Sequence, residues 1–211
     1  MVLQMYRASR GDSDYKRYET KFNQSWEHTG KSANIKDIYL AKPHEIKRSY
    51  RGRRFNDYRG NKSYRVFFHG TRRACNAWRS SSRLRYCHNR ECNLCGILWH
   101  SFKVHCAQPS SMFGSGIYST PCSSKADIYA KNHRIFSRRH AVLICRVACN
   151  NPQSMTSADQ TLKSPAYGYD SVRGLTVAEG GTLNYPEYVV YRDDAIIPIG
   201  VVFYTRKGWQ P

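Results

Sequence analysis

The hydrophobic residues of this chain gather in a few short runs that polar or basic segments separate. Four runs are rich in β-branched and aromatic residues and have the length of strands. They are residues 64–68, 141–149, 187–191 and 195–204. The last run contains Pro198 and Gly200, which predict a bend within that strand. Because strands outnumber helices and their connections are irregular, the pattern predicts an α+β domain with a mostly antiparallel sheet.

One segment, residues 123–136, has the spacing of a helix. Ser124 is its expected cap, with Asp127 three residues later. The stretch FGSGIYST at residues 113–120 holds two glycines, and we expect a tight turn that leads into a short strand. Residues 150–171 are polar and are expected to form a loop.

The first part of the chain differs in character from the rest. Residues 47–65 carry eight Lys and Arg residues with Tyr and Phe between them. We therefore predict a basic, partly disordered N-terminal extension over residues 1–62 and a compact domain over residues 63–211. The extension is expected to contact phosphates and bases of DNA or RNA. A nuclear-localisation signal and a solvated linker are the alternatives.

Charge and composition narrow the class of protein. The chain has 34 Lys and Arg residues against 15 Asp and Glu residues, a net charge of +19. Such an excess favours a polyanionic partner or substrate. No apolar run approaches the roughly 18 residues of a membrane span, and the N-terminus shows no apolar signal-peptide core. We therefore expect an intracellular protein, nuclear or cytoplasmic, without a membrane partner.

Because no secretory signal is visible, we interpret the eight cysteines as metal ligands or buried thiols rather than as disulfides. Most of them fall in the segment 75–106, where Cys92 and Cys95 have the spacing at which two thiolates bind one zinc ion. The predicted ligands are Cys75, Cys87, Cys92 and Cys95, with His88 in place of Cys75 as the second choice. Four protein ligands leave no open position, so the expected zinc ion is structural. Free thiols are the alternative.

Four short motifs carry the candidate chemistry. His69, Gly70 and Thr71 follow the first predicted strand, and Tyr118 lies in the glycine-rich turn. Tyr129 lies on the predicted helix and Glu187 at the start of the strand in NYPEYVVY. Each motif alone is a weak signal, because a histidine after a strand or one tyrosine among 16 is usually structural. Their order and spacing together are much more specific.

With FFHGT, FGSGIYST followed by SSKADIYA, and LNYPEYVVYRDDAIIPIGVVFY in this order, residues 64–205 resemble the poly(ADP-ribose) polymerase family. The separation of eleven residues between Tyr118 and Tyr129 is also that of the family. The chain looks closest to the tankyrases and to small single-domain members that carry a zinc site. In tankyrases the cysteine cluster follows the GIY turn, whereas here it precedes it, so the ligand positions do not transfer.

The resemblance implies the ADP-ribosyltransferase fold, a split and mostly antiparallel sheet with few helices and here a zinc-stapled insertion. It implies that NAD+ is consumed as a substrate by a catalytic triad of His69, Tyr118 and Glu187. Glu187 would stabilise the oxocarbenium-like state that forms when the nicotinamide–ribose bond breaks.

The resemblance also assigns binding roles to the other motif residues. His69 would bond the adenosine ribose, and Thr71 takes the place of a family serine near the adenosine. Gly70 would offer its backbone N–H and C=O to the nicotinamide carboxamide. Tyr118 and Tyr129 would sandwich the nicotinamide ring.

One departure from the family is Ala126, which stands where a serine usually binds the carboxamide oxygen. The segment 174–183 beside the expected acceptor site is short, and this favours mono-ADP-ribosylation of a protein. Transfer to a growing poly(ADP-ribose) chain or to nucleic acid stays open. The rival hypothesis is a catalytically inactive nucleic-acid-binding zinc module. A secreted toxin-like transferase fits the N-terminus and the cysteines less well.

Overall fold

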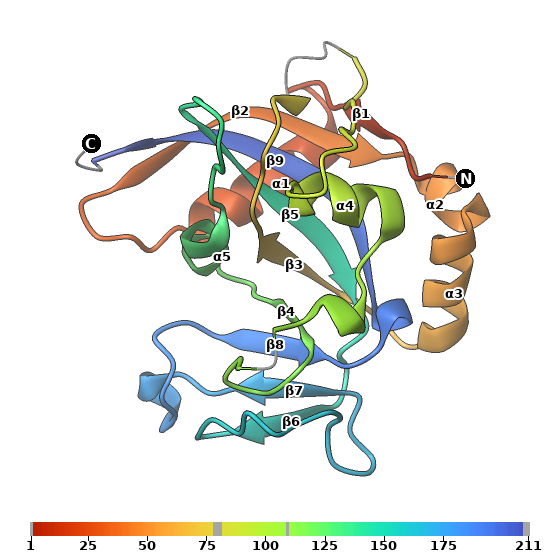
Figure 1. Ribbon diagram of the computed structural model, residues 1–211, viewed down its shortest axis with the longest axis vertical. Coiled ribbons are helices and arrows are strands. Elements are labelled where there is room, and N and C mark those ends of the chain that lie inside the picture. The colour runs from red at the N-terminus through yellow and green to blue at the C-terminus, as the bar shows by residue number, and fades with distance from the viewer. Residues whose placement is uncertain (1, 78–81, 109, 209–211) are drawn as a thin grey trace.

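The computed structural model describes residues 2–77, 82–108 and 110–208 (Figure 1). Its strands are β1 (Met5–Arg7), β2 (Ser32–Ala41), β3 (Arg65–Gly70), β4 (Ile117–Ser119), β5 (Arg139–Val147), β6 (Pro152–Met155), β7 (Ser171–Gly174), β8 (Glu187–Val190) and β9 (Ile196–Lys207). Its helices are α1 (Ser13–Gln24), α2 (Pro43–Arg48), α3 (Tyr50–Arg59), α4 (Asn93–His100) and α5 (Ser123–Tyr129). Short 3₁₀ turns occupy Val104–Cys106, Val177–Glu179 and Asp193–Ala195.

The strands form two sheets. The larger has five strands in the order β1-β2-β9-β5-β3, and every neighbouring pair in it is antiparallel. The smaller has four strands in the order β4-β8-β7-β6, of which only β6 and β7 pair in parallel. Figure 1 shows the smaller sheet below the larger one. The expected α+β fold with a mostly antiparallel, split sheet is confirmed.

The core lies on the central strands β5 and β9, which pair with each other and are buried on both faces. The bend predicted from Pro198 and Gly200 is present as an irregularity in this pairing. Ile144 lies opposite Gly200, but the next residue, Cys145, lies opposite Pro198. An extra residue on one strand in this way is a bulge, which bends the sheet locally.

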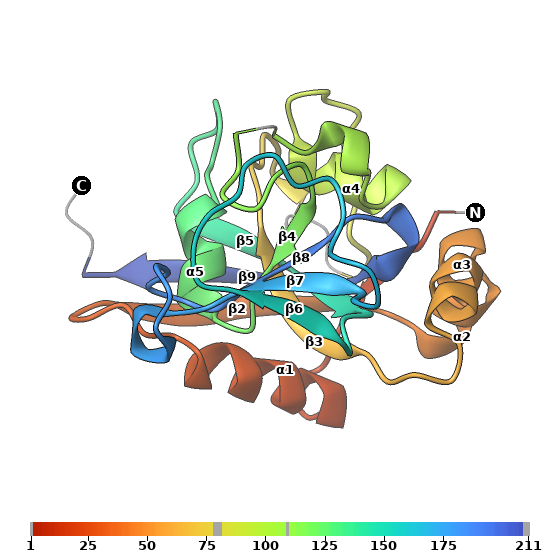
Figure 2. The ribbon, with the colours of Figure 1, turned by 90° about the horizontal axis from the view of Figure 1, so that it is seen from below.

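Residues 2–62 are part of this fold, and the predicted boundary after residue 62 is wrong. Strand β2 lies between β1 and β9, and α1 packs against the sheet through its buried aromatic residues Tyr15, Tyr18 and Phe22. Figure 2 shows α1 on one face of the sheet and α4 on the other. The prediction failed because the few apolar residues of this segment become a continuous buried face only after strand pairing.

The basic stretch within residues 47–65 is folded as well. It forms the end of α2, all of α3 and the start of β3, and the hydroxyl of Ser49 caps α3 by accepting from the N–H of Gly52 at 3.0 Å. Most basic residues of this stretch, predicted to lie in a partly disordered extension, therefore lie on helices and at the start of a strand. Among the described helices, none is both long and apolar enough to cross a bilayer.

The helix predicted over residues 123–136 ends at Tyr129, and Ser124 is not its cap. The hydroxyl of Ser124 accepts from the N–H groups of Glu27 and His28 at 2.6 and 3.1 Å. Asp127 is buried and binds Tyr204 and Arg206. Both polar residues thus anchor α5 to the rest of the fold, which positions the residues that follow on this helix. The expected loop 150–171 also contains the short strand β6.

Candidate active site and candidate metal centre

His69 lies near the end of β3 with its ring held in place on two sides. Its Nδ1 lies 2.7 Å from the carbonyl oxygen of Tyr118, so Nδ1 carries the hydrogen and donates it. The ring of Phe102 packs edge-on against it at a centroid distance of 4.9 Å. Burial lowers the pKa of His69, which keeps the ring neutral. Its Nε2 is then an acceptor and can receive a hydrogen bond from a sugar hydroxyl.

Tyr118 lies on β4, and its hydroxyl is fixed by the glycine-rich turn that precedes the strand. The hydroxyl donates to the carbonyl of Gly114 at 2.9 Å and accepts from the N–H of Phe113 at 2.8 Å. Burial raises the pKa of Tyr118 to about 12, so the phenol stays neutral at physiological pH. The ring is therefore a rigid, uncharged aromatic surface.

Glu187 begins β8 and is 6% exposed. Its carboxylate lies 3.6 Å from the ammonium group of Lys125. The same ammonium lies over the ring of Tyr129, 5.6 Å from its centroid. Burial raises the pKa of Glu187 and the charge of Lys125 opposes that rise. Sequence reasoning missed Lys125, although it stands within the quoted motif SSKADIYA.

If the activity that the resemblance implies is present, we predict that replacing Lys125 by Met shifts the acid limb of its pH–activity profile to higher pH. The ammonium favours the ionised carboxylate of Glu187, so its loss raises the pKa of that carboxylate further. Nicotinamide release from NAD+ measured against pH checks this, with Lys131→Met, an exposed lysine beyond α5, as the matched control. An unchanged acid limb in the Lys125 variant would contradict the pairing.

Gly70 brings β3 into direct contact with α5. A methyl group at this position would overlap the carbonyl oxygen of Ala126 and lie 3.0 Å from the Cβ of Tyr129. Only glycine permits this close approach. Thr71 follows β3 directly and is half-buried. The backbone of residue 70 therefore lies beside the helix that carries Tyr129.

We expect Gly70→Ala to lower the stability of the protein by about 1–3 kcal/mol, as overpacked sites do. Because β3 and α5 must separate, NAD+ binding should weaken as well. Gly96→Ala is the matched control, because nothing lies within 4 Å of its added methyl group. Thermal melts and NAD+ titrations of both variants test this. If the two variants had equal melting temperatures and equal NAD+ affinities, the contact between β3 and α5 would not be tight.

Further residues of α5 named in the sequence analysis differ in their exposure and in their hydrogen bonds. Tyr129 is 50% exposed, so one of its sides is open to a ligand. Ala126 is buried and offers no hydroxyl. The neighbouring hydroxyl of Ser123 donates to the carbonyl of Phe22 at 2.7 Å, and that of Ser124 is also engaged away from Tyr129. Neither serine replaces the missing family hydroxyl.

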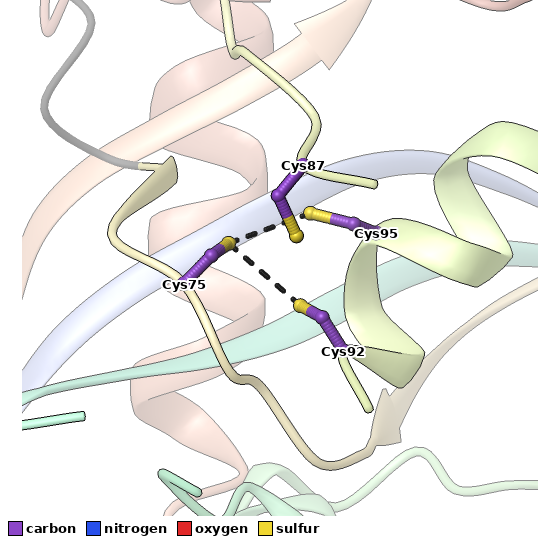
Figure 3. Close-up of side chains that lie close together, drawn as sticks. All are labelled: Cys75, Cys87, Cys92 and Cys95. Carbon is purple, nitrogen blue, oxygen red and sulfur yellow. Dashed lines mark hydrogen bonds between the residues drawn. The ribbon is translucent and has the colours of Figure 1, made fainter. Parts of the chain in front are cut away.

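Four cysteine side chains meet between β3 and the start of α4 (Figure 3). The sulfur atoms of Cys75, Cys87, Cys92 and Cys95 all lie within 4.8 Å of one another, and all four thiols are free. The sulfur of Cys75 lies 3.5 Å from that of Cys95 and 3.7 Å from that of Cys92. The structure thus brings together the four residues of the first-choice ligand set.

This geometry fits a zinc ion. Zn–S bonds of about 2.3 Å in a tetrahedron place sulfur atoms about 3.8 Å apart. Contact with the neighbouring sulfurs and burial together raise the pKa of Cys95. In the absence of a cation, the Cys95 thiol therefore stays protonated although the other sulfur atoms lie close to it. A divalent cation displaces those protons and relieves the crowding. His88, the second-choice ligand, instead stacks on Trp99 at a centroid distance of 4.9 Å.

Arg73 ties the cysteine cluster to the main sheet. Its guanidinium is buried, with the residue 1% exposed, and donates to the carbonyl groups of Cys75 and Arg139, both at 2.6 Å. It also donates to the side chain of Asn132 at 2.9 Å. The charge of Arg73 acts on Cys75, Cys92 and Cys95 and would offset part of the negative charge of their thiolates. The same contacts join the cluster to the chain that leaves α5.

The two mostly antiparallel sheets with few helices are consistent with the fold of a poly(ADP-ribose) polymerase catalytic domain. The family model described as the poly(ADP-ribose) polymerase catalytic domain matches residues 12–206, and the chain belongs to this family. The match includes α1 and β2, in agreement with their place in the fold. A comparison with curated proteins finds no match.

Proposed function

We propose that this protein cleaves the nicotinamide–ribose bond of NAD+ and transfers ADP-ribose to a protein side chain. The observation that carries the proposal is the buried carboxylate of Glu187, paired with Lys125 and set close to Tyr118 and Tyr129. Carboxylates are rarely buried unless they are paired, and perturbed ionisable groups cluster at functional sites.

In the proposed binding mode, the backbone of Gly70 bonds the carboxamide of NAD+ and the rings of Tyr118 and Tyr129 enclose the nicotinamide. The Nε2 atom of His69 accepts from an adenosine ribose hydroxyl, with Thr71 nearby. His69 is suited to this role because its Nδ1 is already committed to the carbonyl of Tyr118.

In the proposed reaction, the bond between nicotinamide and ribose breaks and its electron pair leaves with the neutral nicotinamide. The ribose carbon becomes oxocarbenium-like, and Glu187 stabilises it by accepting a hydrogen bond from a ribose hydroxyl. A nucleophile of the acceptor then bonds that carbon and releases its proton to solvent or to a basic group. Lys125 keeps Glu187 ionised throughout.

We also propose that Cys75, Cys87, Cys92 and Cys95 hold a structural zinc ion. The ion would supply no step of the reaction, because all four positions are occupied by protein ligands. It would instead fasten the segment between β3 and α4 to the sheet. The support is the sulfur geometry and the buried Arg73 beside it.

Two measurements on the zinc-loaded wild type test the transferase proposal. Nicotinamide release from NAD+ reports cleavage, and a gel of protein incubated with labelled NAD+ reports transfer. A sharp labelled band supports mono-ADP-ribosylation, whereas a ladder or smear indicates chain growth. If neither release nor labelling occurs with protein, DNA or RNA present, the chain is an inactive relative, as the binding-module hypothesis requires.

A further inference from the structure

The structure contains an open pocket on the α1 face of the larger sheet. The pocket has a volume of about 520 Å³ and lies between α1, the residues at the start of β3, and the segment that joins β4 to α5. Arg17, Lys21 and Gln24 line it from α1, Tyr64 from the segment just before β3, and Pro121 from the joining segment. Figure 2 shows α1 on the face opposite α4, so this basic pocket is distinct from the cysteine cluster.

The two cations of the basic pocket have no carboxylate partner. Arg17 and Lys21 are one helical turn apart on α1, and in the described part of the chain neither forms an ion pair. Like charges at this spacing destabilise a helix. Burial and the charge of Arg17 lower the pKa of Lys21, so holding it charged costs free energy. An anion between the two would remove both costs.

Two further guanidinium groups extend the positive charge beyond the pocket. Arg146 on β5 and Arg59 at the end of α3 lie over the ring of Tyr64, 4.7 and 5.9 Å from its centroid. The Nε atom of each is buried without a hydrogen-bond partner among the described residues. Buried polar groups are normally satisfied, so both guanidinium groups keep unused hydrogen-bonding capacity. Two cations from α1 therefore line a pocket with Tyr64, and two more, from α3 and β5, lie over the ring of the same tyrosine.

We propose that this basic pocket binds the phosphate backbone of a nucleic-acid strand. Its volume suits a group of nucleotide size rather than a single small ion. A strand can place one phosphate between Arg17 and Lys21 and continue toward Arg59 and Arg146. The net charge of +19 then adds to the attraction at longer range. The proposal does not depend on the transferase activity, because none of these residues belongs to the candidate active site.

The pocket also adjoins the candidate active site along the chain. Pro121, which lines the pocket, follows Thr120, whose hydroxyl donates to the carbonyl of Pro186 at 2.7 Å. Pro186 immediately precedes Glu187. A strand bound in the pocket would thus lie against the segment that positions the beginning of β8.

Fluorescence anisotropy of labelled single-stranded RNA and DNA with the full chain tests the proposal. The double variant Arg17→Glu/Lys21→Glu should bind at least about ten-fold more weakly than wild type at physiological salt. The dependence of log K on log salt should become shallower by about one unit for each phosphate that the variant no longer neutralises. Thermal melts and nicotinamide release of the variant should match those of the wild type. Arg17→Glu alone, at an exposed position, gives the same direction of change if the double variant does not fold.

The matched control is Lys47→Glu/Arg53→Glu, which changes the net charge equally at exposed positions outside the pocket. Its binding should stay within about three-fold of wild type, as rim charges contribute little individually. Equal weakening in the control would overturn the proposal, because diffuse charge would then explain binding. It would also be overturned if wild type bound neither strand, or if free ADP-ribose or pyrophosphate bound at this pocket while RNA and DNA did not.

Discussion

Replacing Glu187 by Gln is expected to slow nicotinamide release by about 100- to 1000-fold, the usual cost of removing one preorganised electrostatic group from a transition state. Glutamine has nearly the same shape and can still accept a hydrogen bond, but it carries no charge. The charge is what the oxocarbenium-like ribose needs. Label transfer from NAD+ should fall in parallel, because both products come from the same cleavage.

The stability of this variant should not fall. Burial raises the pKa of Glu187 in the folded protein, so its contribution to stability is full below the unfolded pKa and is lost as pH rises through the folded pKa. At neutral and alkaline pH the ionised carboxylate therefore costs stability, and Gln removes that cost. The melting temperature of Glu187→Gln at alkaline pH should equal or exceed that of wild type.

The control is Glu19→Gln on α1, a carboxylate away from the candidate site. It should keep wild-type rates of nicotinamide release. NAD+ binding to Glu187→Gln, measured by titration, should remain detectable, which separates a loss of catalysis from a loss of binding. Wild-type turnover by Glu187→Gln would remove the carboxylate from the mechanism.

Loss of one cluster thiol is expected to have the largest effect on stability. Cys95 is fully buried, and its sulfur is one of the four that lie within 4.8 Å of one another. Cys95→Ser replaces a thiolate with a weak ligand and leaves three crowded thiols without a cation. Loss of a structural metal typically costs several kcal/mol. Since about 1 kcal/mol shifts the melting temperature of a chain of this size by about 2–4 °C, we expect a fall of about 10 °C.

The matched control for this experiment is Cys106→Ser, an exposed thiol outside the cluster. It should retain the zinc content and melting temperature of wild type. Zinc measured by a colorimetric chelator should be one ion per chain in wild type and in this control, and should be reduced in Cys95→Ser. A zinc-free wild type that melts at the same temperature as the loaded protein would show that the cluster holds no structural metal.

The cysteine cluster also links stability to the candidate active site. Arg73 donates to Cys75 on one side and to Asn132 and Arg139 on the other. Asn132 lies three residues beyond Tyr129, on the chain that leaves α5. Loosening of the cluster would therefore act through these hydrogen bonds on the segment that directly follows the helix carrying Tyr129 and Lys125. The activity of Cys95→Ser should fall together with its stability.

Local sequence patterns were informative where the chemistry of a residue depends on its immediate neighbours. The strands β3, β5, β8 and β9 follow from short β-branched runs, and the bulge follows from Pro198 and Gly200. The spacing of Cys92 and Cys95, with Cys87 and Cys75 upstream, predicted the set of four cysteines that the fold brings together. These features depend on backbone preferences and on ligand spacing within a single turn, which a sequence displays directly.

Local patterns failed where burial depends on distant partners. Strand β2 carries charged residues, and Asp37 within it is buried only because Arg7 and Arg139 pair with it. Ser124 looks like a helix cap, but the loop that contains Glu27 and His28 takes its hydroxyl. Lys125 pairs with Glu187 only because the fold brings the start of β8 close to α5. None of these partners lies near in sequence, so no local window contains the relevant contact.

The sequence by itself determined the family, the residue types of the candidate site and the order in which they occur. It also determined the excess of positive charge. Tertiary structure alone decided that residues 2–62 belong to the compact fold and that Lys125 faces Glu187. It also decided that cations of α3 and β5 lie over Tyr64, which shares a pocket with two cations of α1. The physical reason is that charge pairing and burial act through space over a few ångströms, and only folding brings such distant parts of the chain within that range.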